Sequence, residues 1–141
     1  MPINLSDAFE SACLRHRDVP FGDLSEVDQI LVSIWALEGD VNNGGFDQYY
    51  FNSSGDTAYY APIALRRIGA MRMADIVDKA NSHFGPSGPP ISGDERQTAL
   101  FKLTESNEKL WHDLDKEFFR YPDDISALLE RFIEENLAGR H

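Results

Sequence analysis

The spacing of apolar side chains is helical along most of the chain. Apolar residues recur every three or four positions between residues 5 and 13. This pattern predicts a first helix that is capped by Asn4 or Ser6 and ends near His16. Pro20 lies in the segment from residue 18 to residue 22, where it interrupts the pattern and separates the first helix from the second.

A second apolar stripe begins after Ser25, whose hydroxyl can cap a helix, and Gly39 is the predicted end of that helix. Residues 42–45 read Asn-Asn-Gly-Gly, which predicts a turn because Asn and Gly tolerate a positive φ. Residues 46–51 are rich in aromatic side chains and also fit a strand by propensity. Their spacing at i, i+3 and i+4 favours a short helix.

The second half of the chain is helical by the same criterion. Pro62 is acceptable only near the start of its helix, and residues 85–93 form a predicted surface loop rich in proline and glycine. Asp94 and Asp123 are the predicted caps of the helices that follow them. The predicted helices cover residues 57–69, residues 71–84, residues 94 to about 120 as one helix or as two with a break near 104–107, and a last segment after residue 123.

Nothing in the chain repeats at a fixed period, and no segment alternates convincingly as a strand does. The sequence therefore predicts an all-α fold with six to eight helices joined by short loops. A length of 141 residues and a mass of 15.9 kDa favour a single domain over residues 1–141. The apolar fraction of 42% is sufficient for one hydrophobic core without disulfides or metals.

The charge of the chain is unusual for its size. Thirteen Lys and Arg residues stand against 24 Asp and Glu residues, which gives a net charge of -11 at pH 7. Bulk electrostatics of this sign excludes direct binding to nucleic acid and to an anionic membrane surface. The same charge is suited to basic proteins and to cations.

The sequence also bears on the compartment of the protein. No stretch approaches the 18 apolar residues of a membrane span, and the first residues lack the basic and apolar regions of a signal peptide. Cys13 is the only cysteine, so no internal disulfide can form. These features predict a protein of the reducing cytoplasm.

Motifs of catalysis are absent from the sequence. Glu108 and His112 are spaced to share a metal, but a solvated helix face explains such a pair more simply. Cys13 has no sequence context of a nucleophile and is interpreted as a structural thiol. No phosphate loop, dinucleotide fingerprint or hydrolase motif occurs. We therefore expect no catalytic residue, no metal and no cofactor, and the protein is not expected to be an enzyme.

The most unusual stretch runs from residue 41 to residue 56 and is dense in amides, glycines and aromatics. In a structural interpretation, the two glycines reverse the chain, the amides satisfy helix ends and loop backbone, and the aromatics fill the core. In a functional interpretation, the same amides and aromatics form a binding surface. The two interpretations are compatible. The motif residues are Asn43, Gly44, Gly45, Phe46, Gln48, Tyr49 and Asn52.

The decapeptide from Asn43 to Asn52, together with residues 64–70, resembles the bacterial DNA-mimic protein family. Weaker likeness continues through residues 114–119 and 128–136, so the resemblance spans about residues 24–137. The resemblance implies an all-α fold and no catalytic residue. For the member that gave the family its name, it implies binding to a DNA-binding protein in place of DNA.

The acidic residues are unevenly distributed. Residues 1–56 hold ten acids and two bases, a net of −8, whereas residues 57–93 have a net of +2 and residues 94–141 a net of −5. The strongest negative field is therefore expected around the first two helices and the double glycine. The alternative is that the acids only keep the protein soluble. The candidate protein-binding residues are Asp18, Asp23, Glu26, Asp28, Asp40, Asp47 and Asp56.

The sequence thus favours a non-catalytic acidic domain that binds a basic protein, with a DNA-binding protein as the specific case implied by the resemblance. One alternative is an immunity-type protein that neutralises a basic toxin. Another is an enzyme or a small-ligand binder that uses the Asn43–Asn52 segment. The partner and the oligomeric state stay open, and a homodimer is compatible with the sequence.

Overall fold

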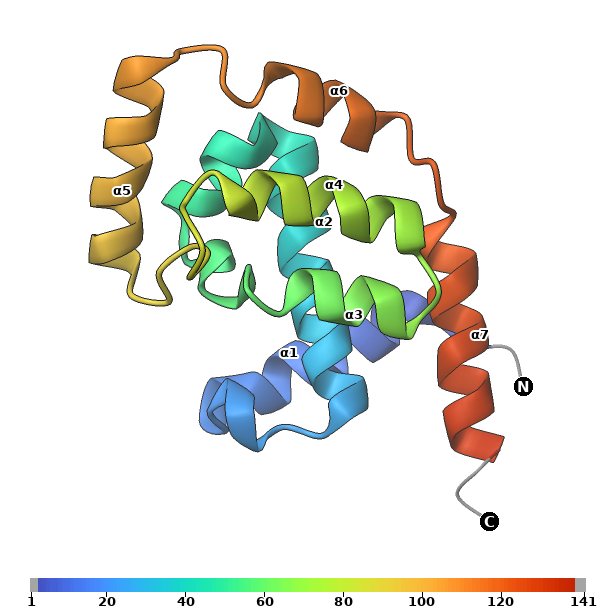
Figure 1. The fold of residues 1–141 in the computed structure, drawn as a ribbon. Coiled ribbons are helices and arrows are strands. Elements are labelled where there is room, and N and C mark those ends of the chain that lie inside the picture. Colours follow the sequence, from blue (N-terminus) through green and yellow to red (C-terminus); the bar gives the residue numbers. More distant parts are fainter. Residues whose placement is uncertain (1–2, 139–141) are drawn as a thin grey trace.

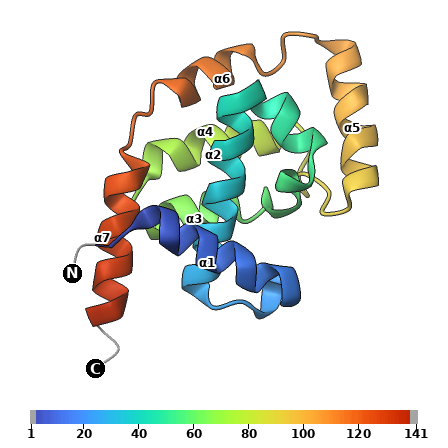
Figure 2. The same ribbon diagram turned by 180° about the vertical axis from the view of Figure 1, so that it is seen from behind.

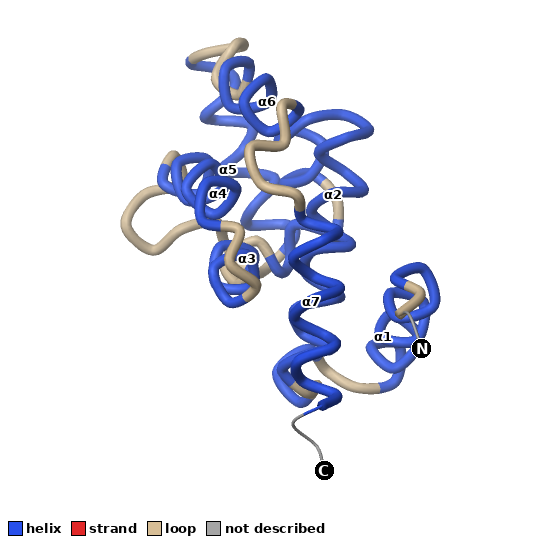
Figure 3. The backbone as a smooth tube through the Cα atoms, turned by 90° about the vertical axis from the view of Figure 1, so that its right-hand side faces the viewer, coloured by secondary structure: helices blue, strands red, loops and turns tan. Residues whose placement is uncertain are grey.

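The computed structural model describes residues 3–138, which form seven α-helices, two short 3₁₀-helices and no strand (Figure 1, Figure 3). The predicted all-α class and number of helices are confirmed. In chain order the elements are α1 (Leu5–Asp18), η1 (Phe21–Asp23), α2 (Glu26–Phe51), η2 (Ser53–Thr57), α3 (Ala61–Arg67), α4 (Met71–Ser82), α5 (Gly93–Ser106), α6 (His112–Phe119) and α7 (Ile125–Ala138).

α1 begins at one of its two predicted caps. The side chain of Asn4 accepts a hydrogen bond from the backbone N–H of Asp7 at 3.1 Å. The helix continues to Asp18, two residues beyond the predicted end at His16. Pro20 then interrupts the helix as predicted, and the chain turns through η1 into α2.

α2 passes through Gly39 without a break, so the prediction that the second helix ends there is wrong. Leu37 and Val41 are both fully buried and lie one helical turn apart on either side of that glycine. Their apolar stripe keeps the helix packed on the core, and this packing outweighs the weak helix propensity of one exposed glycine. The predicted cap is present, because the Ser25 hydroxyl accepts the N–H of Asp28 at 3.2 Å.

The helical backbone of α2 is interrupted at Gly44 and Gly45, where φ is −152° and +75°. The turn predicted over residues 42–45 is therefore a kink at these two positions. After the kink the chain is helical again up to Phe51, as the aromatic spacing predicts. The positive φ of Gly45 meets the expectation for a double glycine between two helical segments.

The helix predicted over residues 57–69 is shorter than expected. Thr57 closes η2, and α3 starts four residues later with Pro62 in its first turn, where the missing N–H of proline is tolerated. α4 begins at Met71 as predicted and ends at Ser82, two residues before its predicted end.

The long helical pattern that starts at Asp94 is two helices, α5 and α6. The break covers residues 107–111 and so lies just after the expected position at residues 104–107. The prediction that Asp94 caps α5 is wrong. Ser92 is the cap, because its hydroxyl accepts the N–H of Glu95 at 3.4 Å.

Asp123 does not cap the last helix as predicted. The side chain of Asp124 accepts the N–H of Ala127 at 3.1 Å in the first turn of α7. Asp123 instead accepts the N–H of Met73 at 2.9 Å and thereby binds the first turn of α4. The two adjacent carboxylates thus satisfy the N-termini of two different helices.

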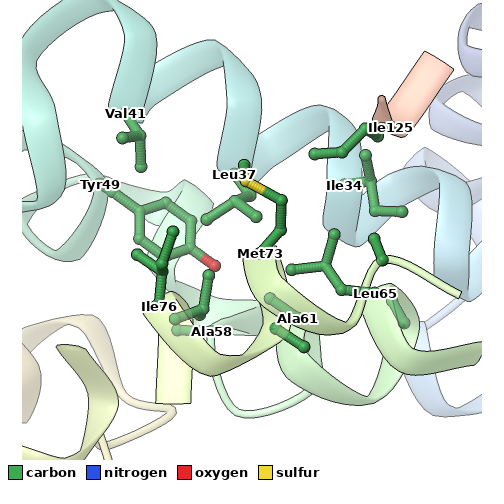
Figure 4. Close-up of a cluster of buried hydrophobic side chains, with 14 of the residues drawn as sticks. Ile34, Leu37, Val41, Tyr49, Ala58, Ala61, Leu65, Met73, Ile76 and Ile125 are labelled. Atoms are coloured by element: carbon green, nitrogen blue, oxygen red, sulfur yellow. The ribbon is translucent and has the colours of Figure 1, made fainter. Parts of the chain in front are cut away.

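α2 lies in the middle of the molecule, with α3 and α4 on one side and α1 on the other (Figure 1, Figure 2). Leu37 of α2, Leu65 of α3, Met73 of α4 and Ile125 of α7 are all buried within one hydrophobic cluster (Figure 4). Each such side chain contributes about 1.5–3 kcal/mol through burial. The central position of α2 places its two ends, and the acids on them, at opposite sides of this core.

Candidate protein-binding surface

The first group of predicted acids lies where α1, η1 and α2 meet. Asp18 ends α1, Asp23 ends η1 and Glu26 begins α2, and all three residues are exposed. Glu26 forms a salt bridge with Arg67 at 3.2 Å, in which both side chains are about half exposed. Asp18 and Asp23 form no salt bridge among the described residues. This end of α2 therefore presents free carboxylates to solvent.

Asp28 does not belong to this exposed group, contrary to expectation. It is only 7% exposed, and both of its carboxylate oxygens accept hydrogen bonds from Arg15, at 2.6 and 2.7 Å. This bidentate bond raises the pKa of Arg15. The pair joins α1 to α2, so Asp28 has a structural role and is not accessible to a partner.

The second group of predicted acids lies at the other end of α2. Asp40 precedes the kink, Asp47 follows it, and Asp56 lies in η2. Because α2 is regular up to the kink, the 14 helical steps from Glu26 to Asp40 correspond to about 21 Å along the helix axis. The predicted acids therefore form two groups at opposite ends of α2.

Two members of the second group are already engaged within the chain. Asp40 accepts hydrogen bonds from Gln48 at 2.8 Å and from Asn52 at 3.4 Å. Asp56 accepts one from Arg96 at 2.9 Å, although half of the Asp56 side chain remains exposed. Asp47 is exposed and has no salt bridge among residues 3–138. Asp47 is thus the freest carboxylate at this end.

A residue that is distant in sequence stabilises the kink. Asp115 of α6 accepts a hydrogen bond from the backbone N–H of Phe46 at 2.8 Å. An ideal Cβ on Gly45 would lie 2.5 Å from the other carboxylate oxygen of Asp115, so no side chain fits there. Burial raises the pKa of Asp115, and the nearby Asp47 raises it further. The bond to Phe46 and the charge of His112 oppose that increase.

The amide side chains of the motif bind one another and a carboxylate. Asn43 donates to the Gln48 side chain at 3.2 Å, and Gln48 donates to Asp40. We expected these amides to hydrogen-bond backbone groups of helix ends and loops. That expectation is wrong, because their acceptors are side-chain oxygens. The Asn52 side chain also faces Asp40, while its backbone oxygen accepts from Arg96. The network fixes the two parts of α2 across the kink.

The aromatic side chains of the motif lie in the core. Phe46, Tyr49 and Tyr50 are fully buried, and Phe46 packs on Trp111 and Phe118 at centroid distances of 6.2 and 5.8 Å. The Tyr49 hydroxyl has no hydrogen-bond partner within the described residues, and burial raises its pKa. Phe46 and Tyr49 are therefore not accessible to a binding partner.

Sequence reasoning missed Arg96, which is fully buried and organises the region beside the motif. A Cβ on Gly55 would lie 2.7 Å from its Nε, so η2 packs directly on the guanidinium. Its spacing of four positions from the apolar Leu100, which puts both side chains on one face of a helix, is the sequence signal that could have marked its position on the inner face of α5. The acceptors of its hydrogen bonds are the backbone oxygens of Tyr50, Asn52, Pro90 and Ile91 and the carboxylate of Asp56.

A second contact that the sequence did not indicate joins α2 to the α6–α7 connection. The Tyr121 hydroxyl donates to Glu38 at 2.7 Å and accepts from Asn42 at 2.7 Å. Burial raises the pKa of Glu38, and it also raises the pKa of Tyr121 to about 12. Tyr121 itself has a φ of 47°, a left-handed conformation that this pair of bonds helps to hold.

Residues 3–138 contain no group of three or more His, Cys, Asp or Glu side chains placed to hold one metal ion. Glu108 and His112, the pair with metal-like spacing, are both exposed. None of the helices in this range is long and apolar enough to cross a bilayer.

The fold and the surface define an acidic all-α protein in which the candidate binding carboxylates, Asp28 excepted, lie near the two ends of a kinked central helix. The family model of the DMP19-like protein matches residues 22–136, so the chain belongs to the DMP19-like family, a family of DNA-mimic proteins. This match confirms the resemblance drawn from the motif. Comparisons with curated proteins and with solved structures gave no significant match. α1 lies N-terminal to the matched residues.

Proposed function

We propose that this chain is a non-catalytic protein of the cytoplasm that binds a basic DNA-binding protein and occupies the surface to which that partner binds DNA. The single cysteine supports a reducing compartment. Membership of a DNA-mimic family supports the mode of binding. The observation that carries the proposal is the uneven charge, with a net of −8 in residues 1–56.

The arrangement of the acids suits a substitute for a phosphate backbone. Glu26 and Asp40, at the two ends of the regular part of α2, are about 21 Å apart along its axis, a length of about six base-pair steps in duplex DNA. Asp18 and Asp23 at one end and Asp47 at the other are exposed and form no salt bridge among the described residues. α2 lies between the two groups, and the bond from Phe46 to Asp115 and the amide network hold its kink, so we expect the spacing to stay constant, as in a duplex.

These acids are expected to act together. An exposed ion pair contributes only about 0–1 kcal/mol, so no single carboxylate is a hot spot. The collective field instead raises the association rate and makes affinity depend strongly on ionic strength. The Asn43–Asn52 amides, which a small-ligand site would use, are already bonded within the chain.

The proposal is tested by competition with DNA. The protein is immobilised, loaded with extract of its own host, and eluted either with a short DNA duplex or with salt of equal ionic strength. We expect the duplex to release bound proteins that the matched salt leaves on the column. Each released protein should then lose DNA when the soluble chain is added. Release by salt and duplex alike, with no loss of DNA binding, would contradict the proposal.

A further inference from the structure

A groove of about 510 Å³ lies along one side of α1, and Phe9 and Cys13 in its lining also pack partly against the core. Its walls are formed mainly by one face of α1, and a side chain of α2 closes one edge. Its lining includes Phe9, Glu10, Cys13, Leu14 and Arg17 of α1 and Trp35 of α2.

The groove exposes large apolar side chains. Leu14 is 48% exposed and Trp35 is 55% exposed, although the ring of Trp35 packs on Phe9 at a centroid distance of 5.2 Å. Ala12, on the other side of α1, is fully buried and fixes the helix to the core. This side of α1 therefore leaves Leu14 and Trp35 largely exposed within residues 3–138, while Phe9 and Cys13 beside them are partly buried.

The residues on this side of α1 have the spacing of neighbours on a helix surface. Glu10, Cys13 and Arg17 stand at i, i+3 and i+7, and Leu14 lies beside them at i+4. These four side chains therefore share one face of α1, with Cys13 and Leu14 between two charged residues. This face carries one acid and one base, in contrast to the acidic surface around it.

Local charge decides what can lie on this face. Two copies of a chain with a net charge of -11 repel each other, so contact between them requires a patch that is balanced in itself. Arg15 and Arg17 are the two bases among residues 1–56. Arg15 is held by Asp28, whereas Arg17 and Glu10 form no salt bridge among the described residues. Glu10 and Arg17 thus balance each other on this face of α1, which carries no net charge although residues 1–56 as a whole are acidic.

We propose that the α1 groove is occupied by the same groove of a second copy, with the two α1 helices antiparallel about a two-fold axis between Cys13 and Leu14. Glu10 lies as many positions before that point as Arg17 lies after it. Each Glu10 therefore faces Arg17 of the other copy, and Leu14 of each copy packs on the opposite Cys13. This inference is independent of the proposed function, because it uses none of the acids assigned to the partner surface.

Charge exchange tests the register of the two helices. The mass of the protein in solution is measured across the micromolar to millimolar range by sedimentation equilibrium. Glu10→Arg alone and Arg17→Glu alone each place like charges opposite one another twice per dimer. We expect each to weaken dimerisation about tenfold or more, and the double variant E10R/R17E to restore it. Failure of the double variant to restore the dimer overturns the antiparallel register.

The apolar centre is tested in the same way with a matched control. Leu14→Glu should abolish the dimer, whereas Phe101→Glu, at a 68% exposed position of α5, should leave it unchanged. Helical circular dichroism and melting of each variant show that the fold is retained. A wild-type protein that is monomeric throughout, or a dimer that L14E does not affect, overturns the proposal.

Cys13 provides a direct geometric readout because it is the only cysteine. Packed helices lie about 8–10 Å apart, and the two Cys13 residues would stand almost opposite each other near the axis. A short bismaleimide of matching span should link two wild-type chains covalently. The link should be lost in R17E and regained in E10R/R17E. Equal cross-linking of the wild type, R17E and E10R/R17E would mean that the link arises from random collision of chains, which would count against this interface.

Discussion

The Asp115 carboxylate accepts a hydrogen bond from the backbone N–H of Phe46 at 2.8 Å, across 69 positions of the sequence. Phe46 begins the helical segment after the kink, the position at which backbone N–H groups of a helix need a partner from outside it. A side chain from α6 thus acts as the N-cap of the last turns of α2. The contact explains how a kink at two glycines is kept in one conformation.

Replacing Asp115 should therefore destabilise the protein through the loss of this cap. Asp115→Ala removes the acceptor and is expected to lower the free energy of unfolding by about 1–2 kcal/mol. Asp115→Asn keeps an oxygen acceptor and should cost less. Urea unfolding measures both variants, with Lys116→Ala at an exposed position of the same helix as the control. Equal stability of D115A and K116A would refute the role of the cap.

The kink also predicts opposite effects for two glycines of the same helix. Gly45→Ala forces a side chain into a positive φ and against Asp115, which should cost at least about 1–2 kcal/mol. Gly39→Ala meets open space in a helical backbone and should stabilise by about 0.5–1 kcal/mol. Denaturant midpoints of the two variants test this. A shift in the same direction for both would mean that conformation at the kink is not the cause.

Arg96 is expected to be the most sensitive charged residue of the chain. Arg96→Met leaves the buried backbone oxygen of Tyr50, the partly buried one of Asn52 and the Asp56 carboxylate without this donor, at a cost of about 3 kcal/mol or more. Arg96→Lys retains the charge but has fewer donors, so its loss should be smaller. Thermal melting compares both with Arg120→Met, an exposed arginine whose replacement should change little. Similar melting of R96M and R120M would contradict the assignment.

The helical class and most helix positions could be predicted because apolar spacing reports which face of each segment is buried. The error at Gly39 shows the limit of that reasoning. A glycine after an apolar stripe is a local signal for the end of a helix. The burial of Leu37 and Val41 on either side of Gly39, however, depends on tertiary packing. Local propensity costs about 1 kcal/mol at most, which the packing of two core residues exceeds.

The surface was harder to predict than the fold. The sequence showed that residues 1–56 are acidic, but it could not show that Asp28 is buried against Arg15 or that Asp56 binds Arg96. Both contacts join helices that are separate in sequence, and nothing in their spacing indicates a partner. Asp115 was missed as the cap of the kink for the same reason.

The stability of the protein should depend on the protonation of Glu38. Its pKa is raised by burial above the ordinary value of 4.5, although the hydrogen bond from Tyr121 opposes the increase. Between the ordinary and the raised value, the folded state keeps a proton that the unfolded state has lost. The free energy of unfolding should therefore fall as the pH rises through that window. Glu38→Gln should flatten this part of the profile in urea titrations, and the exposed Glu105→Gln should not.

The acidic groups at the two ends of α2 predict a position-dependent effect on binding. The triple variant D18N/D23N/D47N removes three exposed carboxylates that form no salt bridge among residues 3–138. It should slow association with a partner released by DNA and flatten the dependence of affinity on salt, with little change in stability. The rates are measured by stopped-flow or surface binding at low and at moderate salt.

The matched control is the triple variant E105Q/E130Q/E134Q, which removes the same charge from exposed positions of α5 and α7. If the partner is attracted by the negative charges around α2, the control triple should slow association less than D18N/D23N/D47N does. Screening limits the effect of a surface charge to about 10 Å at ordinary salt. Equal slowing by both triples would mean that only net charge attracts the partner. Unchanged rates in both would mean that the carboxylates keep the protein soluble and take no part in recognition.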